Sequence, residues 1–178
     1  MHATIADVVA DTAQNSIEAG ASRIDVTLVE DGAATSVVIA DNGKGMDEET
    51  RARAFDPFFS EAGKHDRRRV GLGLPILKQL CEACGGGLSL ESEKGVGTTL
   101  RYHFDPGSID LPPMGDLAET LTTLFNYPGD FELSFTHRTP NGEYSVSRGE
   151  LSEAVGGLDS VEGLALAKEF LRGQEAEL

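Results

Sequence analysis

The sequence predicts an α+β protein, in which helices pack on one layer of β-sheet and a small α+β extension follows. Helical spacing of apolar residues over 2–20 and 71–84 indicates two amphipathic helices. Strand-like apolar runs on either side of turns, over 23–41 and 88–104, indicate two β-hairpins. Because each element carries an apolar face that must be buried, the pieces predict helices layered on a sheet.

The first predicted helix combines an apolar face with a polar pair. Gly20 marks its end, as a glycine just past the last helical turn often does. The residues that share its apolar face are Ile5, Val8, Val9, Thr12 and Ser16. Asp11 and Asn15 stand four residues apart, so they lie one above the other at the edge of that face.

A hairpin and a short helix follow in the sequence. Residues 23–30 alternate between apolar and polar, and residues 35–41 are more continuously apolar. The Asp-Gly-Ala-Ala turn between them predicts that the two strands pair. Residues 46–55 are predicted to be helical, with acidic residues in the first turn, where the helix dipole favours negative charge.

Residues 55–70 have neither helical nor strand periodicity. They mix a proline, a glycine and a basic cluster, which predicts a mobile loop. The helix at 71–84 has glycines at its start, and residues 88–92 and 98–104 read as the second hairpin.

The composition of the sequence changes at residues 105–116, which are rich in proline and glycine. We therefore expect two parts, an N-terminal domain at 1–106 and a small α+β extension at 107–178. The elements predicted in the extension are a helix at 116–125, strands at 131–138 and 142–148, and a helix at 160–171.

The composition restricts the classes of partner. The 178 residues include 15 Lys and Arg against 30 Asp and Glu, a net charge of −15, which repels nucleic acids and anionic membranes. No apolar run approaches the roughly 20 residues that a membrane-spanning helix needs, and no signal-peptide pattern occurs at the N-terminus. We expect a cytoplasmic protein with no nucleic-acid or membrane partner.

The two cysteines, Cys81 and Cys84, form a C-x-x-C pair. This spacing is compatible with metal binding or redox chemistry, but the four histidines are scattered and supply no finger-like spacing. Cys81 continues the apolar stripe of a helix that Cys84 ends before a glycine run. Core packing is therefore the favoured interpretation of both.

Polar and glycine positions suggest a site for a purine nucleotide. Asp41 ends an apolar strand, where its carboxylate can accept the exocyclic amine of adenine, while Gly43 and Gly45 leave room for the ring. A structural Asp-Asn-Gly turn would explain the same residues. Gly71 and Gly73 enter a helix whose free N–H groups suit phosphate oxygens, although a simple helix start would also place glycines there.

The polar pair of the first helix suggests the remaining chemistry. Asn15 offers a neutral oxygen to Mg²⁺, which prefers oxygen ligands and bridges phosphates. One turn earlier, Asp11 is placed to accept a proton from an attacking water or to orient that water. An exposed polar pair without function is the alternative interpretation.

Five segments in a fixed order resemble a known superfamily. DTAQNSIEAGAS, DNGKGM, FDPFF, GLGLPI and GVGTT, between about residues 3 and 104, are similar to the N, G1, F and G2 boxes and the closing Gly-Thr of the GHKL superfamily. That superfamily contains gyrase, heat-shock chaperone, histidine kinase and mismatch-repair ATPases with the Bergerat fold. The resemblance implies a two-layer α/β sandwich, a mixed sheet with helices on one face.

The resemblance also implies ATP and Mg²⁺ as cofactors. The ATP-binding residues that it implies are Asn15, Asp41, Gly43, Gly45, Lys64, Gly71, Leu72, Gly73 and Thr98, with Asn15 as the metal ligand and Asp11 as the catalytic residue. Residues 55–70 correspond to the lid, where Lys64 and Arg67–Arg69 either reach the phosphates or form a solvated basic face.

The motifs mix two branches of this superfamily. NSIEAGASRIDV looks like the gyrase and mismatch-repair branch, whereas FDPFFSEAG and GLGLPILKQL look like histidine kinases. In the hydrolysing branch a Glu commonly stands four before the Asn. The shorter Asp11 at this position implies slow turnover or none.

No phosphoacceptor hairpin is recognisable in the sequence. His137 precedes Arg-Thr-Pro directly, whereas acceptor boxes separate the histidine from that triplet, and its surroundings read as a β-hairpin. We expect a stand-alone kinase or slow ATPase in signalling that acts with a protein partner, through its acidic surface or its extension. The alternative is a non-catalytic, anti-sigma-like interaction module that regulates a partner protein and is controlled by nucleotide binding.

Overall fold

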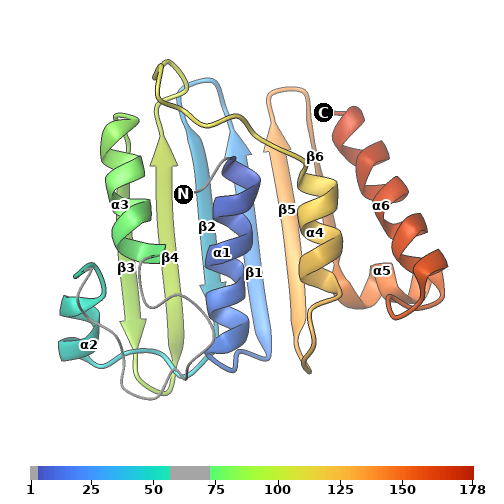
Figure 1. Cartoon of the computed structure of the whole chain (residues 1–178), viewed down its shortest axis with the longest axis horizontal. Coiled ribbons are helices and arrows are strands. Elements are labelled where there is room, and N and C mark those ends of the chain that lie inside the picture. The colour runs from blue at the N-terminus through green and yellow to red at the C-terminus, as the bar shows by residue number, and fades with distance from the viewer. Residues whose placement is uncertain (1–3, 57–72) are drawn as a thin grey trace.

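The computed structural model describes residues 4–56 and 73–178, and within them it shows one mixed six-stranded sheet with helices (Figure 1). The strands are β1 (Arg23–Glu30), β2 (Thr35–Asp41), β3 (Gly87–Glu93), β4 (Gly97–Phe104), β5 (Glu132–Thr139) and β6 (Gly142–Ser147). The helices are α1 (Ile5–Glu18), α2 (Glu48–Arg53), α3 (Gly73–Ala83), α4 (Leu117–Phe125), α5 (Arg148–Val155) and α6 (Val161–Ala176).

The strand order is β3-β4-β2-β1-β5-β6, and both predicted hairpins form. Every neighbouring pair is antiparallel except β1 and β5, which run parallel with Ile24 opposite Leu133. β2 lies between β1 and β4, so that Asp41 at its end stands opposite Ile24 on one side and Thr98 on the other. The predicted mixed sheet is thus confirmed.

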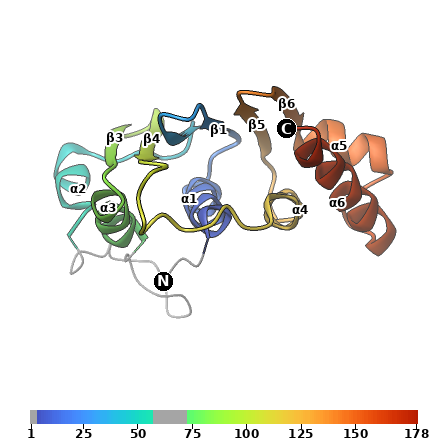
Figure 2. The ribbon, with the colours of Figure 1, turned by 90° about the horizontal axis from the view of Figure 1, so that it is seen from above.

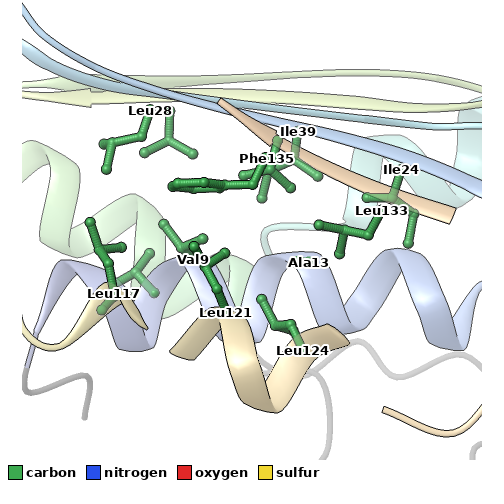
Figure 3. Close-up of a cluster of buried hydrophobic side chains, with 14 of the residues drawn as sticks. Val9, Ala13, Ile24, Leu28, Ile39, Leu117, Leu121, Leu124, Leu133 and Phe135 are labelled. Atoms are coloured by element: carbon green, nitrogen blue, oxygen red, sulfur yellow. The ribbon is translucent and has the colours of Figure 1, made fainter. Parts of the chain in front are cut away.

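A row of helices covers one face of the sheet. Figure 2 shows α3, α1 and α4 side by side beneath the strands. Alternating burial along β1 and β2 directs every second side chain towards these helices. Figure 3 shows the resulting core, where Val9 and Ala13 of α1 and Leu121 of α4 face Ile39 and Phe135 of the sheet. This arrangement confirms the predicted two-layer α+β fold.

α1 is fixed at both of its ends. Thr4 caps it by accepting a hydrogen bond from the Asp7 N–H at 3.1 Å. The first helical N–H groups, of Ile5 and Ala6, donate to backbone carbonyls in the connection that precedes α4. At the other end, Gly20 adopts φ +74°, which agrees with the predicted stop.

Residues 107–178 continue the same sheet. β5 joins the free edge of β1, and α4 packs between α1 and α6. The predicted limit at residue 106 falls in the connection between β4 and α4. Whether the extension is a separate domain stays a prediction.

Helix α5 is the element that the sequence pattern missed. It follows β6 without a loop and is only eight residues long, so apolar periodicity is weak. Ser147 caps the helix: the Glu150 N–H donates to Ser147 Oγ at 3.3 Å, and Ser147 Oγ donates to Glu150 Oε2 at 2.9 Å. Gly156 ends the helix with φ +77°. The Ser-x-x-Glu spacing was therefore the available signal.

Cys81 and Cys84 are buried, and burial raises the pKa of the Cys81 thiol to about 12. The Cys84 thiol donates to the Asp110 carbonyl at 3.3 Å. Both side chains therefore pack as core residues. Among the described residues, no helix combines the length and apolar character needed to cross a membrane.

Candidate nucleotide-binding site

Asp41 is held in a fixed orientation at the end of β2. Ser16 Oγ of α1 donates to Asp41 Oδ2 at 2.6 Å, and the Gly43 N–H donates to Asp41 Oδ1 at 2.9 Å. Asp41 is half-buried, and Ser16 is buried beside it. Each carboxylate oxygen therefore has one internal partner and retains a lone pair for a further donor.

Asn42 locks the turn that follows. Its Oδ1 accepts hydrogen bonds from the N–H groups of Ser22 and Arg23, both at 2.9 Å, and its Nδ2 donates to Ser22 Oγ. These bonds tie the end of β2 to the start of β1. Sequence reasoning missed the roles of Asn42 and Ser16. An Asn in a turn is too common for its partners to be read from the chain.

The glycines of this turn are required by the protein's own packing. A Cβ on Gly43 would lie 3.0 Å from Asp41 Oδ1 and 3.1 Å from the Ala19 carbonyl oxygen. Gly45 adopts φ +60°, and a Cβ there would lie 1.9 Å from the Glu93 carbonyl oxygen. Close approach of the β3–β4 hairpin therefore explains Gly45, where the sequence had suggested room for a base.

Thr98 lies beside Asp41 on β4 and belongs to a hydroxyl pair. Thr98 Oγ1 and Ser92 Oγ are 2.8 Å apart, while Ser92 Oγ donates to the Gly97 carbonyl and accepts from the Met46 N–H. Since Ser92 has a single hydroxyl proton, Thr98 is the donor within the pair. The Thr98 oxygen keeps its acceptor capacity at the end of the sheet that carries Asp41.

α1 brings the other candidate residues to the same end of the molecule. Asn15 is exposed and directly precedes Ser16, which contacts Asp41. A Cβ on Gly73 would lie 3.9 Å from Asn15 Nδ2, so the first residue of α3 lies next to Asn15. Asp11 is exposed one helical turn before Asn15. The structure therefore brings Asn15, Asp41, Thr98 and Gly73 to one region.

Several predicted residues fall outside the described part of the chain. These are Lys64, Arg67, Arg68, Arg69, Gly71 and Leu72. Of the predicted lid, residues 55 and 56 are described, and the Phe55 ring centroid lies 5.7 Å from Lys78 Nζ of α3.

The side chains that are described fit a nucleotide and its metal. A half-buried carboxylate with spare lone pairs suits the amino group of adenine. The described residues contain no group of three or more His, Cys, Asp or Glu that could hold a metal ion by themselves. A Mg²⁺ ion that arrives with phosphate oxygens and water needs only one or two protein ligands, and the exposed Asn15 is suited to be one.

Comparison with known proteins identifies the family. The model for the histidine kinase-, DNA gyrase B- and HSP90-like ATPases matches residues 2–108. The heme sensor protein HssS of Staphylococcus saprophyticus is 40% identical over 81 residues, 46% of this chain and 17% of that protein. The sensor histidine kinase AruS of Pseudomonas aeruginosa is 37% identical over 94 residues, 49% of this chain and 9% of that protein. The chain thus spans less than a fifth of these two relatives.

A solved structure shares the fold beyond the matched segment. The N-terminal domain of a DNA repair protein superposes with a TM-score of 0.57 at 16% identity, over 90% of this chain and 58% of that one. Because 90% of the chain exceeds residues 2–108, the likeness in fold includes part of the extension. The motifs, the sheet and the match to the family model agree: this chain belongs to the histidine kinase-, DNA gyrase B- and HSP90-like ATPase family and carries the ATP-binding domain that sensor kinases share.

Proposed function

We propose that the protein binds Mg²⁺·ATP between α1, the Asp41 turn and the start of α3, and that it acts in signalling as a kinase or slow ATPase. The observation that carries this proposal is the hydrogen bond of 2.6 Å from Ser16 to Asp41, with Asn15 next in the chain and beside Gly73. In this proposal, α1 would position the groups for both ends of a nucleotide.

Asp41 would select the base. The adenine amino group donates to the carboxylate, whereas guanine presents a carbonyl oxygen at the equivalent position, which the carboxylate repels. Asn15 and the N–H groups of Gly73 and Leu74 at the start of α3 would hold the phosphates, and a bound Mg²⁺ would neutralise charge on the phosphate oxygens. Asp11 would accept a proton from the attacking hydroxyl or water, or orient it.

Nucleotide titrations test the binding step. We expect Mg²⁺·ATP to bind at least about tenfold more tightly than Mg²⁺·GTP, measured by isothermal calorimetry on the full chain. Asp41→Asn should weaken ATP binding by roughly tenfold or more, because a charge-assisted hydrogen bond is lost. Asp25→Asn, at a half-buried carboxylate on β1, is the matched control. Absence of ATP binding at millimolar concentration would refute the proposal.

Replacement of Asp11 tests the chemical step. If Asp11 acts on the attacking group, Asp11→Ala should lower phosphate release or autophosphorylation about a hundredfold, within the usual range for general base catalysis. Asp11→Glu should raise the rate if the reach of the shorter side chain limits turnover. Equal rates in the wild type, Asp11→Ala and Asp11→Glu would show that Asp11 takes no part in the reaction.

A nucleotide-switched, non-catalytic interaction module is the second candidate. It is favoured by the packing of the extension against α1, where Gln14 Nε2 donates to Tyr127 Oη at 3.2 Å. Changes in α1 on nucleotide binding would then reach the extension and its partner. Intact ATP binding without any turnover, in the presence of the partner, would favour this candidate over the enzyme.

A further inference from the structure

Helix α6 displays an apolar pair to solvent. Among the described residues, five large hydrophobic side chains are exposed, and three of them belong to α6. Leu166 is 53% exposed and Phe170 is 48% exposed, and their spacing of four places them on one face. The opposite face of α6 is already buried against the protein through Ala167 and Leu171. Adjoining exposed apolar side chains on one helix face are a candidate interaction surface.

The charges around this pair have one sign. Glu162 lies four residues before Leu166, and Glu169 lies between the pair in the chain, and both are exposed. Glu162, Leu166, Glu169 and Phe170 together are named the α6 face.

The basic residues of α6 pair with acidic residues in and just before α4. Lys168 forms an ion pair with Glu119 of α4, and Arg172 Nη2 contacts Asp116 Oδ2 at 2.9 Å, just before α4. Residues 148–178 contain seven acidic and three basic side chains, and the third basic one, Arg148, donates to backbone carbonyls. The α6 face therefore offers apolar contact bordered by negative charge without a basic side chain of its own.

We propose that the α6 face docks an amphipathic helix of a partner protein, in which an apolar stripe is bordered by Lys or Arg. Such a helix would cover Leu166 and Phe170 and place its cations against Glu162 and Glu169. A second copy of this chain would instead bring Glu162 and Glu169 near their own counterparts, which costs free energy. Because α6 packs on α4, and α4 on α1, the docked helix would leave the nucleotide site accessible.

Two synthetic helical peptides test the proposal. They have equal length and the same leucine stripe, but one has lysine and the other glutamate on its flanks. We expect the full chain to bind the lysine peptide at least about tenfold more tightly, measured by fluorescence anisotropy, and added salt to weaken that binding. The double variant Leu166→Ala/Phe170→Ala should lose about tenfold in affinity. Val161→Ala, at an exposed position on the same helix, is the control and should bind like the wild type.

A charge reversal gives the second arm. Glu162→Lys/Glu169→Lys should invert the preference, so that the glutamate peptide binds better. All of these side chains are exposed, so the urea midpoint of the alanine double variant should stay close to that of the wild type. Glu162 lies in the first turn of α6, so the charge reversal should lower the midpoint slightly through the helix dipole while the protein stays folded. Equal binding of the lysine peptide by wild type and the alanine double variant would overturn the proposal. The proposal would also be overturned if the wild type sediments as a dimer and the alanine double variant as a monomer, since a second copy of the chain would then cover the α6 face.

Discussion

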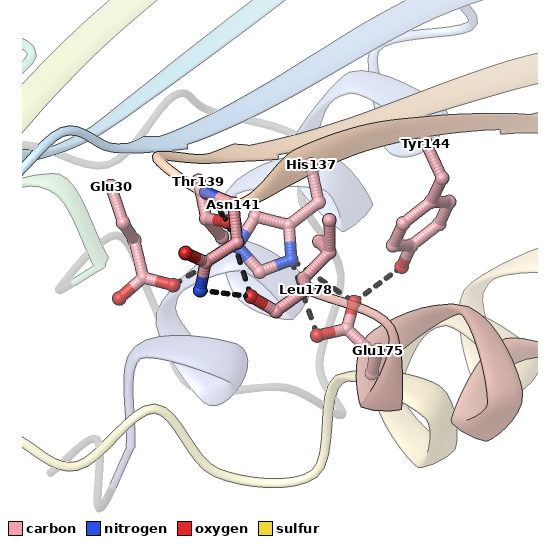
Figure 4. A network of polar contacts seen from close by, with 7 residues as sticks. All are labelled: Glu30, His137, Thr139, Asn141, Tyr144, Glu175 and Leu178. Atoms are coloured by element: carbon pink, nitrogen blue, oxygen red, sulfur yellow. Dashed lines mark hydrogen bonds and ion pairs between the residues drawn. The ribbon is translucent and has the colours of Figure 1, made fainter.

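His137 provides a test of how the extension is held to the sheet. It is 3% exposed on β5, and both of its ring nitrogens face carboxylates (Figure 4). Nδ1 lies 3.1 Å and 3.2 Å from the two carboxylate oxygens of Glu175 on α6, and Nε2 lies 3.0 Å from Glu30 Oε1 on β1. The Tyr144 hydroxyl also donates to Glu175. Only the doubly protonated imidazolium can donate to both carboxylates.

The pKa of His137 determines the pH range in which this network stabilises the fold. Burial lowers the pKa, but the hydrogen bonds and charges of Glu175 and Glu30 outweigh it and raise the pKa of His137 above 6.5. A raised folded-state pKa means that the stabilisation is complete below pH 6.5 and is lost as the pH rises through the folded-state value. The free energy of unfolding should therefore fall on the alkaline side, where His137 releases its proton.

His137→Ala should remove the contribution of the network at every pH. Breaking a buried ion pair costs about 3–5 kcal/mol, and we expect the lower end, about 3 kcal/mol, because the Glu30 side chain is 38% exposed and regains water. For a protein of this size that corresponds to a fall of about 6–12 °C in Tm. Glu175→Gln, which keeps the shape, should cost about 1.5–3 kcal/mol.

Urea denaturation from about pH 6 to about pH 9 measures the alkaline loss of stability and the cost of each substitution, because this range runs from just below the free-histidine pKa to well above it. The alkaline loss of stability should be present in the wild type and in His103→Gln, which alters an exposed histidine on β4, and should be reduced in Glu175→Gln. Parallel pH profiles for the wild type and His137→Ala would show that the imidazolium does not hold the network together.

Two further predictions concern the candidate site. Ser16→Ala should leave the fold intact but weaken ATP binding by roughly tenfold in calorimetry, because Asp41 loses a charge-assisted hydrogen bond that orients it; an unchanged Kd would show that the Gly43 N–H suffices. Gly97→Ala should lower the free energy of unfolding by more than about 2 kcal/mol, since its Cβ would lie 2.0 Å from the Asp41 carbonyl oxygen at φ +143°. Gly32→Ala, at φ +82° with nothing within 4 Å, isolates the backbone strain, and equal losses in the two variants would exclude the predicted clash.

Local patterns in the chain predict most of the N-terminal elements. Strand alternation and turn residues determine the hairpins β1–β2 and β3–β4, because their partners are adjacent in sequence. The parallel pairing of β1 with β5 joins residues about a hundred positions apart, and no local signal specifies it. The sequence therefore indicated an extension but not that it completes the sheet.

In the candidate site too, some residues could be predicted from local sequence and others could not. Asp41 and Asn15 are predicted from the chemistry of their side chains, and Thr98 from the resemblance of its motif to the family. Ser16 and Asn42 act on neighbours rather than on a ligand, and their roles depend on the exact approach of α1 and β1 to the turn after β2. Such supporting contacts become visible only when the elements are packed.

The extension supports α1, the helix that carries Asn15 and Ser16 of the candidate site. The first two N–H groups of α1, those of Ile5 and Ala6, donate to the carbonyls of Pro113 and Met114, and the side of α1 packs on α4. α1 lies against β1, and β1 pairs with β5 of the extension along the edge opposite β2. Without residues 109–178, the family segment would expose an unpaired strand edge and the apolar flank of α1. We therefore expect the orientation of Asn15 and Ser16, and with it the affinity for ATP, to depend on residues that lie outside the segment matched by the family.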